Sequence, residues 1–150
     1  MKISELVSHL NDDYFLPSIQ REFVWLNNRN EQRIEKLFDS ILQEYPIGNI
    51  MLWKKEKPQG QSLPFSTYKF IENYSDDSIN EESDLNGIRC PHLILDGQQR
   101  LTSLLIGLKG RYSYKKYTTN HETRLYINLF ADLEDIEENT YGMKYEFNLQ

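Results

Sequence analysis

The chain is organised around residues 93–105, which read LILDGQQRLTSLL. The first three of them, Leu93 to Leu95, form the short apolar run expected of a buried strand. The last part repeats leucine at the spacing of one helix face, at positions 101, 104, 105 and, just beyond, 108. The polar residues Asp96 to Arg100 stand between these two patterns. The stretch therefore predicts a strand, a turn and a helix in direct succession, with a polar cluster at the junction.

The start of this helix is a candidate binding site for an anion. Asp96 and Gly97 allow a sharp backbone turn, and the first N–H groups of the helix have no partner within it. These groups and the positive end of the helix dipole attract anions. Arg100 stands in the first turn, where a cation is unfavourable unless it has an anionic partner such as a phosphate or a carboxylate. A plain turn is the alternative explanation for Asp96 and Gly97.

Two motifs in this order resemble the N-terminal domain of GmrSD-type restriction proteins. They are residues 95–104, LDGQQRLTSL with the DGQQR motif, and residues 16–25 upstream, LPSIQREFVW. The resemblance also covers residues 34–42 and 45–48, so that it extends from about residue 14 to residue 108. That domain is similar to the ParB/sulfiredoxin fold. The resemblance implies nucleotide binding, and in some members nucleotide hydrolysis, that controls a DNA nuclease in defence against phage.

The resemblance also implies which residues form the nucleotide site. It places Gln20 and Arg21 in the site, lets Trp25 shape or cover it, and puts Ile47 and Gly48 near the nucleotide. Composition alone favours a surface turn held in the core by its aromatic side chains for residues 20–25, and the resemblance reverses that preference. A simple turn explains residues 47–48 equally well.

Roles in nucleotide hydrolysis follow for the DGQQR motif. Arg100 and Arg21 would grip phosphates, while Gln98 and Gln99 would orient the phosphates or a water molecule. Asp96 would hold Mg²⁺ or polarise that water. The hypothesised nucleotide-binding set is Gln20, Arg21, Trp25, Ile47, Gly48, Gly97, Arg100 and Thr102, with Asp96, Gln98 and Gln99 as the catalytic set.

Composition predicts one soluble domain. With 150 residues the chain can bury a single core, and its 39% hydrophobic and 27% charged residues are ordinary for a globular protein. No apolar run approaches the ~20 residues needed to span a bilayer, and the N-terminus lacks a secretion signal. The single cysteine, Cys90, excludes an internal disulfide, so the cytoplasm is the expected compartment. We expect a fragment of a longer protein that carries, or binds, a separate nuclease.

Sulfiredoxin chemistry and a zinc site are both unfavoured. Sulfiredoxins use a cysteine near their phosphate-binding turn, where this chain has Gln98 and Gln99. The three histidines, at positions 9, 92 and 121, lack the spacing and the cysteine neighbours of a zinc site.

The net charge of −6 argues against this chain holding duplex DNA unaided, because phosphate neutralisation supplies most non-specific affinity. We therefore expect weak or no DNA binding at physiological salt, with DNA contacted only through the full-length protein. Residues 111–117 interleave cations with aromatic residues. That pattern is found in surfaces that stack on nucleic acid, but it is also typical of a solvated turn beside a strand, which the acidic charge favours.

The remaining patterns predict further helices and strands. A helix capped by Ser4 carries apolar residues 6, 7 and 10, and a second helix, capped by Asn28 with Glu31, carries its apolar stripe at residues 34–42 and its charges on a solvated face. Strands are expected at residues 14–16, 49–53, 125–130 and 145–149, one more within 65–74, and a short helical turn within 132–138. Ser75 to Asn86 is acidic and nearly devoid of apolar residues, so we expect it to be mobile and cleaved early by protease.

The sequence thus predicts one α+β domain spanning residues 1–150, with a small mixed sheet and packed helices. The leading functional hypothesis is a nucleotide-binding and nucleotide-hydrolysing module that uses Mg²⁺. A DNA-binding or ParB-like nuclease domain is the second hypothesis, and a non-enzymatic docking module is the third.

Overall fold

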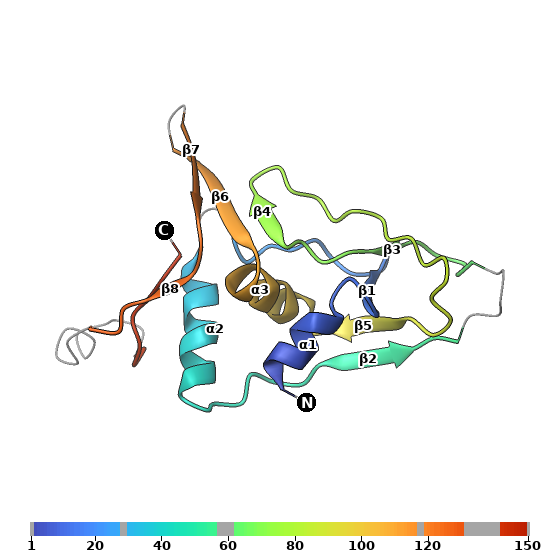
Figure 1. The fold of residues 1–150 in the computed structure, drawn as a ribbon, viewed down its shortest axis with the longest axis horizontal. Helices are drawn as coiled ribbons and strands as arrows, with labels where there is room; N and C mark the ends of the chain where they lie inside the picture. Colours follow the sequence, from blue (N-terminus) through green and yellow to red (C-terminus); the bar gives the residue numbers. More distant parts are fainter. Residues whose placement is uncertain (1, 28–29, 57–61, 117–118, 131–141, 150) are drawn as a thin grey trace.

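A computed structural model describes residues 2–27, 30–56, 62–116, 119–130 and 142–149. These parts of the chain form an α+β fold, as predicted (Figure 1). The helices are α1 (Ile3–His9), α2 (Gln32–Leu42) and α3 (Gln98–Leu108). The strands are β1 (Tyr14–Pro17), β2 (Met51–Lys54), β3 (Thr67–Tyr68), β4 (Asn73–Ser75), β5 (His92–Asp96), β6 (Arg111–Lys116), β7 (Thr119–Thr123), β8 (Tyr126–Ile127) and β9 (Phe147–Asn148).

The strands form three sheets, two of them mixed. The largest has the order β2-β5-β1-β3, in which β1 and β5 are parallel and both outer strands are antiparallel to their neighbours. In the second sheet, of order β4-β6-β7, β4 runs parallel to β6 and β7 antiparallel to it. Strands β8 and β9 form an antiparallel pair. Figure 1 shows α3 between the four-stranded sheet and the β6–β7 pair, so one helix connects the two larger sheets.

Helix α3 is the centre of the core. Leu101, Leu104, Leu105 and Ile106 are each between 0 and 2% exposed, and they pack with apolar residues of α1, α2, β1 and β5. Burial of one such side chain contributes roughly 1.5–3 kcal/mol. The fourth leucine of the predicted stripe, Leu108, is 51% exposed because the helix ends there.

The cap predicted for α1 is wrong, and α2 begins later than predicted. Helix α1 begins at Ile3 with Lys2 before it, and Ser4 lies inside the helix, where the Glu5 carboxylate accepts a hydrogen bond from the Lys2 N–H at 3.4 Å. Helix α2 begins at Gln32, and Asn28 lies outside the described residues. Glu31 precedes this helix but does not belong to a solvated face, since it is 5% exposed.

Some strands were predicted in their places but not in their lengths, and two were missed. Residues 65–74 contain the start of β4 as well as β3, and β7 was not predicted. The solvated turn favoured for residues 111–117 is wrong over 111–116, which form β6 because β4 and β7 pair with that segment on either side. The strand expected at residues 125–130 is reduced to Tyr126–Ile127, and Leu129 and Phe130 are exposed. The strand expected at 145–149 is Phe147–Asn148, and the acidic turn expected at 132–138 lies outside the described residues.

The acidic segment after β4 is bonded to the four-stranded sheet, contrary to the mobility expected from its composition. The Lys69 N–H donates to the Glu81 carbonyl and the Ser83 N–H to the Thr67 carbonyl, each at 2.8 Å. The Asn80 side chain donates to the Lys69 carbonyl, also at 2.8 Å. The backbone of β3 therefore supplies partners that the acidic sequence by itself does not reveal.

Candidate functional site

The junction between β5 and α3 requires a glycine. Gly97 adopts φ 96°, a left-handed conformation that side chains disfavour, and precedes the first residue of α3. A Cβ at this position would also lie 3.1 Å from Cγ1 of Ile50. No side chain caps α3, so the first N–H groups of the helix depend on partners from outside it.

Two glutamines fasten the loop at residues 20–25 to this junction. The Gln20 side chain donates to the Leu95 carbonyl at 2.9 Å. The Gln99 side chain, which is 8% exposed, accepts from the Val24 N–H and donates to the Glu22 carbonyl, both at 2.9 Å. Because Gln99 uses both its donor and its acceptor on backbone groups, its role in this structure is to position the loop.

Arg100 fastens a second loop, at residues 47–50. Its guanidinium donates to the Ile47 carbonyl at 2.6 Å and to the Asp96 carboxylate at 3.1 Å. The guanidinium is 19% exposed. Gly48 has φ 86°, and a Cβ there would overlap Nη1 of Arg100. The sequence predicted either a phosphate or a carboxylate as the partner of Arg100. In the structure the Asp96 carboxylate is that partner.

Gln98 and Thr102 present buried polar atoms without partners. They lie one turn apart on α3 and are 5% and 0% exposed. Neither the Gln98 Oε1 nor the Thr102 Oγ1 has a hydrogen-bond partner. Leaving such an atom unsatisfied costs about 1–3 kcal/mol, so the pair calls for an explanation.

The other hypothesised site residues differ in exposure. The Asp96 side chain is 66% exposed, Arg21 is exposed, and Trp25 is partly buried against the core. We call the set formed by residues 20–25, 47–50 and 96–102 the α3 start site. The structure brings all of the hypothesised residues into these three segments, and the hydrogen bonds of Gln20, Gln99 and Arg100 hold the segments together.

The donor set of this site fits Mg²⁺ only in company with phosphate. Within the described parts of the chain, no three His, Cys, Asp or Glu residues are grouped as metal ligands. Asp96 and Glu22, both exposed, carry the carboxylates of these segments, and Mg²⁺ in nucleotide sites is commonly held by one or two carboxylates together with phosphate oxygens and water. The residues present therefore fit a metal that arrives with a nucleotide.

Sequence reasoning missed the backbone partners of this site. The groups bonded by Gln99 belong to Glu22 and Val24, and the group bonded by Arg100 belongs to Ile47. Backbone groups carry no residue-specific signal, so only the glycine at position 48 pointed to a close approach.

Comparison with known proteins matches the chain to a family. The model of the GmrSD restriction endonuclease N-terminal domain matches residues 3–149. The chain belongs to this family. It is also 33% identical over 129 residues to the uncharacterized protein MJ0686 of Methanocaldococcus jannaschii, an alignment that covers 85% of this chain and 20% of that protein. The chain therefore spans about a fifth of the length of this relative. Among the described residues of the GmrSD N-terminal domain, no helix has the length and apolar character to cross a membrane.

Proposed function

We propose that this GmrSD N-terminal domain binds and hydrolyses a nucleoside triphosphate at the α3 start site. The observation that carries the proposal is the pair of buried, unpartnered atoms, Gln98 Oε1 and Thr102 Oγ1, on the first two turns of α3. A ligand that supplies hydrogen-bond partners there would remove the cost of leaving them unpaired. The N–H groups at the same helix end provide the complementary site for phosphate.

Each polar residue of the site has a role in this proposal. The helix N–H groups and the exposed Arg21 would bind phosphate oxygens. Gln98 would accept a hydrogen bond from the nucleotide or hold the attacking water. Gln20, Gln99 and Arg100 act as positioning residues, because their hydrogen bonds fix the two loops around the helix start.

Asp96 is the residue proposed to meet the metal. One of its oxygens accepts from Arg100, and the side chain is otherwise open to solvent. When bound, Mg²⁺ would neutralise phosphate charge. Asp96 would hold it in place.

We further propose that this activity serves restriction of DNA as part of a larger protein. The family to which the chain belongs is named for restriction endonucleases, and the M. jannaschii relative is about five times longer than the aligned segment. A nuclease domain in the same polypeptide or in a partner protein would receive the signal of nucleotide binding or hydrolysis.

Calorimetric titration tests the proposal. The chain is titrated with each of the four common ribonucleoside triphosphates, with and without Mg²⁺, and release of phosphate is followed in parallel. Gln98→Met should weaken binding about 2- to 12-fold, the equivalent of one neutral hydrogen bond. It should leave the melting temperature unchanged or raise it, because it removes an unpaired buried atom.

Gln32→Met is the matched control. Gln32 is likewise the first residue of a helix but is exposed, so this variant should bind nucleotide as the wild type does. Absence of binding to every triphosphate at millimolar concentration would contradict the proposal and favour the hypothesis of a non-enzymatic docking module. Unchanged affinity in Gln98→Met would remove the two unpartnered atoms from the site.

A further inference from the structure

One segment of this acidic chain is strongly basic. Residues 109–116 and 119–124, which we call the basic ribbon, contain five lysines and arginines and a single acidic residue, Glu122. The ribbon therefore carries a formal charge of +4. Since the net charge of the chain is −6, all other residues together carry −10. Such segregation of charge is the electrostatic footprint of a surface that meets a polyanion.

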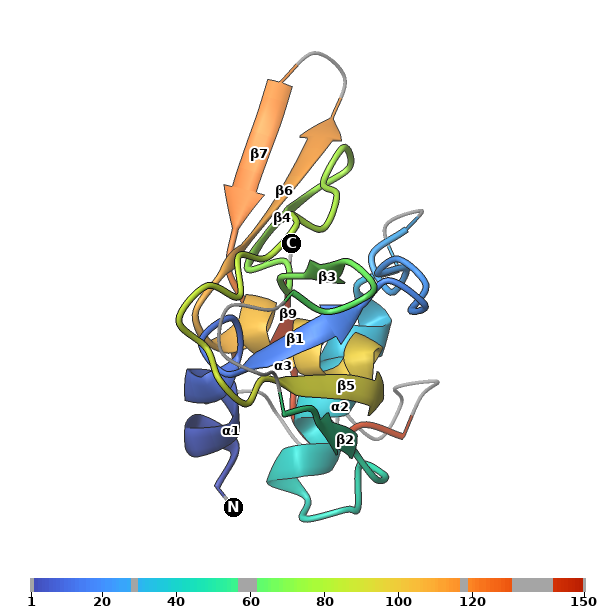
Figure 2. The ribbon, with the colours of Figure 1, turned by 90° about the vertical axis from the view of Figure 1, so that its right-hand side faces the viewer.

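The ribbon projects from the body of the domain. It consists mainly of β6 and β7, which pair in antiparallel register from Tyr112 opposite Thr123 to Lys116 opposite Thr119. Figures 1 and 2 show this pair extending beyond the sheet and helices in two views a quarter turn apart. A two-stranded β-ribbon of this kind is one of the elements that the major groove of DNA admits.

Arg111 and Lys115 lie on the face of β6 opposite to its two tyrosines. Tyr112 is 0% exposed, and its hydroxyl donates to the buried Glu31 carboxylate at 2.8 Å. Tyr114 lies on the same face, with its ring 5.3 Å from that of Tyr112. Arg111 and Lys115 alternate with them and are exposed. Tyr112 is thus unavailable as a platform for unstacked bases, and the ring of the partly buried Tyr114 is already stacked on that of His121, which argues against single-stranded nucleic acid.

The base of the ribbon contains a pocket of about 530 Å³ with an excess of positive charge. Lys109, Arg111 and Arg124 line it together with Glu72 and Glu122. Arg111 pairs with Glu122 at 2.7 Å, whereas neither Lys109 nor Arg124 has an ion-pair partner among the described residues.

Two of these cations face one another. The register of β6 and β7, continued by one residue, places Arg111 opposite Arg124. Like charges at opposed positions destabilise a strand pair, and Glu122 offsets only one of the two. An anionic partner would offset the other.

We propose that the basic ribbon binds the phosphate backbone of duplex DNA. Arg111 and Lys115 lie on one face four residues apart, about 13 Å along the strand. At that separation the two side chains cannot both contact one phosphate group, but they can contact different phosphates along a DNA backbone.

This contact goes beyond the proposed nucleotide site. Lys109 follows the end of α3, while the nucleotide site surrounds its beginning, about 16 Å away along the 11-residue helix. DNA binding and nucleotide binding are therefore separable by mutation. The acidic body of the domain keeps the interaction weak and salt-dependent in the isolated chain, in agreement with the expectation from net charge.

DNA titration across a salt series tests the proposal. Binding of a fluorescent 20-base-pair duplex is measured between 25 and 200 mM NaCl with the 150-residue chain. Four phosphate contacts predict a slope of log K against log [NaCl] of about −3 to −4, with binding lost near physiological salt. The double variant Lys109→Gln, Arg124→Gln should reduce the magnitude of this slope by about 2, one for each cation removed.

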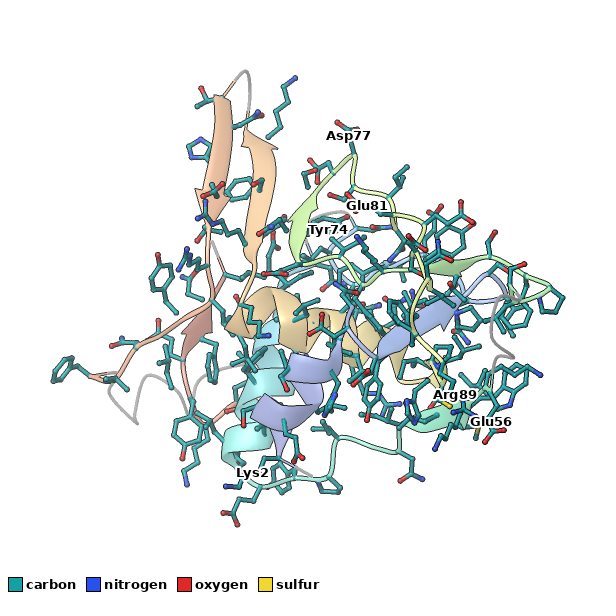
Figure 3. The ribbon with its side chains drawn as sticks, turned by 45° about the vertical axis from the view of Figure 1, so that its right-hand side comes forward. Lys2, Glu56, Tyr74, Asp77, Glu81 and Arg89 are labelled. Carbon is teal, nitrogen blue, oxygen red and sulfur yellow. The ribbon has the colours of Figure 1, made fainter. Side chains whose placement is uncertain are left out.

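The control is the double variant Lys2→Gln, Arg89→Gln, which changes the net charge equally. Both of its residues lie away from the ribbon (Figure 3). This variant should keep the wild-type slope. An unchanged slope in the ribbon variant, or an equal loss in the control, would overturn the proposal. Tighter binding to phosphatidylserine vesicles than to DNA at the same salt would assign the ribbon to a membrane surface instead.

Discussion

Gly48 and Arg100 show how one residue of the α3 start site restricts another. The left-handed φ of Gly48 brings its backbone against the guanidinium, which at the same time donates to the neighbouring Ile47 carbonyl. A side chain at position 48 would therefore meet two penalties, one from its own backbone conformation and one from the overlap with Arg100. The two residues form a single unit that sets the position of the loop at residues 47–50.

Substitutions at Gly48 should separate these two penalties. Gly87 has nearly the same φ, 83°, but open space around it, so Gly87→Ala reports the cost of the conformation alone, roughly 1–2 kcal/mol. Gly48→Ala should cost more than Gly87→Ala in the wild-type chain. It should cost about the same as Gly87→Ala once Arg100→Ala has removed the overlapping guanidinium. Urea denaturation of the wild type, the three single variants and the double variant Gly48→Ala, Arg100→Ala gives the coupling free energy. Additive costs would show that Arg100 does not restrict position 48.

Some features of the DGQQR motif could be predicted from the sequence and others could not. The sequence placed a strand end, a turn and a helix start correctly around Asp96 and Gly97, and it recognised that Arg100 needs an anionic partner. It could not distinguish Gln98 from Gln99, since both are glutamines in the first turn. Their difference comes from backbone groups more than 70 residues away, which bond Gln99 and leave Gln98 unpaired.

At the scale of elements, α2 uses its acidic residues internally. Glu31 accepts from the Tyr112 hydroxyl, Asp39 accepts from the N–H groups of residues 144 and 145 at 2.8 Å each, and Glu35 accepts from the Leu149 N–H at 3.2 Å. The periodic apolar stripe of α2 was predictable from its spacing. The role of the acidic residues was not predictable, because the groups that they bond lie between 81 and 114 residues further along the chain.

Glu35 should make stability depend on pH in the direction opposite to an ordinary salt-bridged acid. Burial raises the pKa of Glu35 above its usual value of 4.5, the hydrogen bond from Leu149 lowers it, and the charge of Glu31 raises it again, with a net increase. The folded state therefore holds the proton more tightly than the unfolded state, and this group adds stability as pH falls from neutral toward 4.5.

Glu35→Gln should remove this contribution while keeping an oxygen that can accept from Leu149. Urea melts of wild type and variant between pH 7 and pH 5 measure the difference. The variant should gain stability relative to the wild type as pH rises through this range. A difference that is constant with pH would show that Glu35 has the same pKa in the folded and unfolded states.

At the scale of the whole molecule, α3 joins the α3 start site, whose charges balance, to the basic ribbon. The beginning of α3 lies next to the loops at residues 20–25 and 47–50, and its end leads directly into the basic ribbon. The sequence indicated the helix and the interleaved cations, but the burial of Tyr112 opposite the exposed Arg111 and Lys115 depends on the tertiary packing of β6. Strands as short as β3 and β8 are likewise products of that packing, since two residues carry no periodicity.

Hydrogen exchange should reveal how stability is distributed over this arrangement. Amides of α3 between Leu104 and Ile106 should exchange most slowly, because their residues are almost completely buried and opening them requires disruption of the core. The amides of Lys69 and Ser83 should show intermediate protection through their bonds between β3 and the acidic segment. The exposed residues Asp76 and Asp77 should exchange fastest within that segment. Mass spectrometry of exchanged peptides measures all three classes, and exchange at residue 83 as fast as at residues 76–77 would mean that the acidic segment detaches from the sheet, as its composition alone predicts.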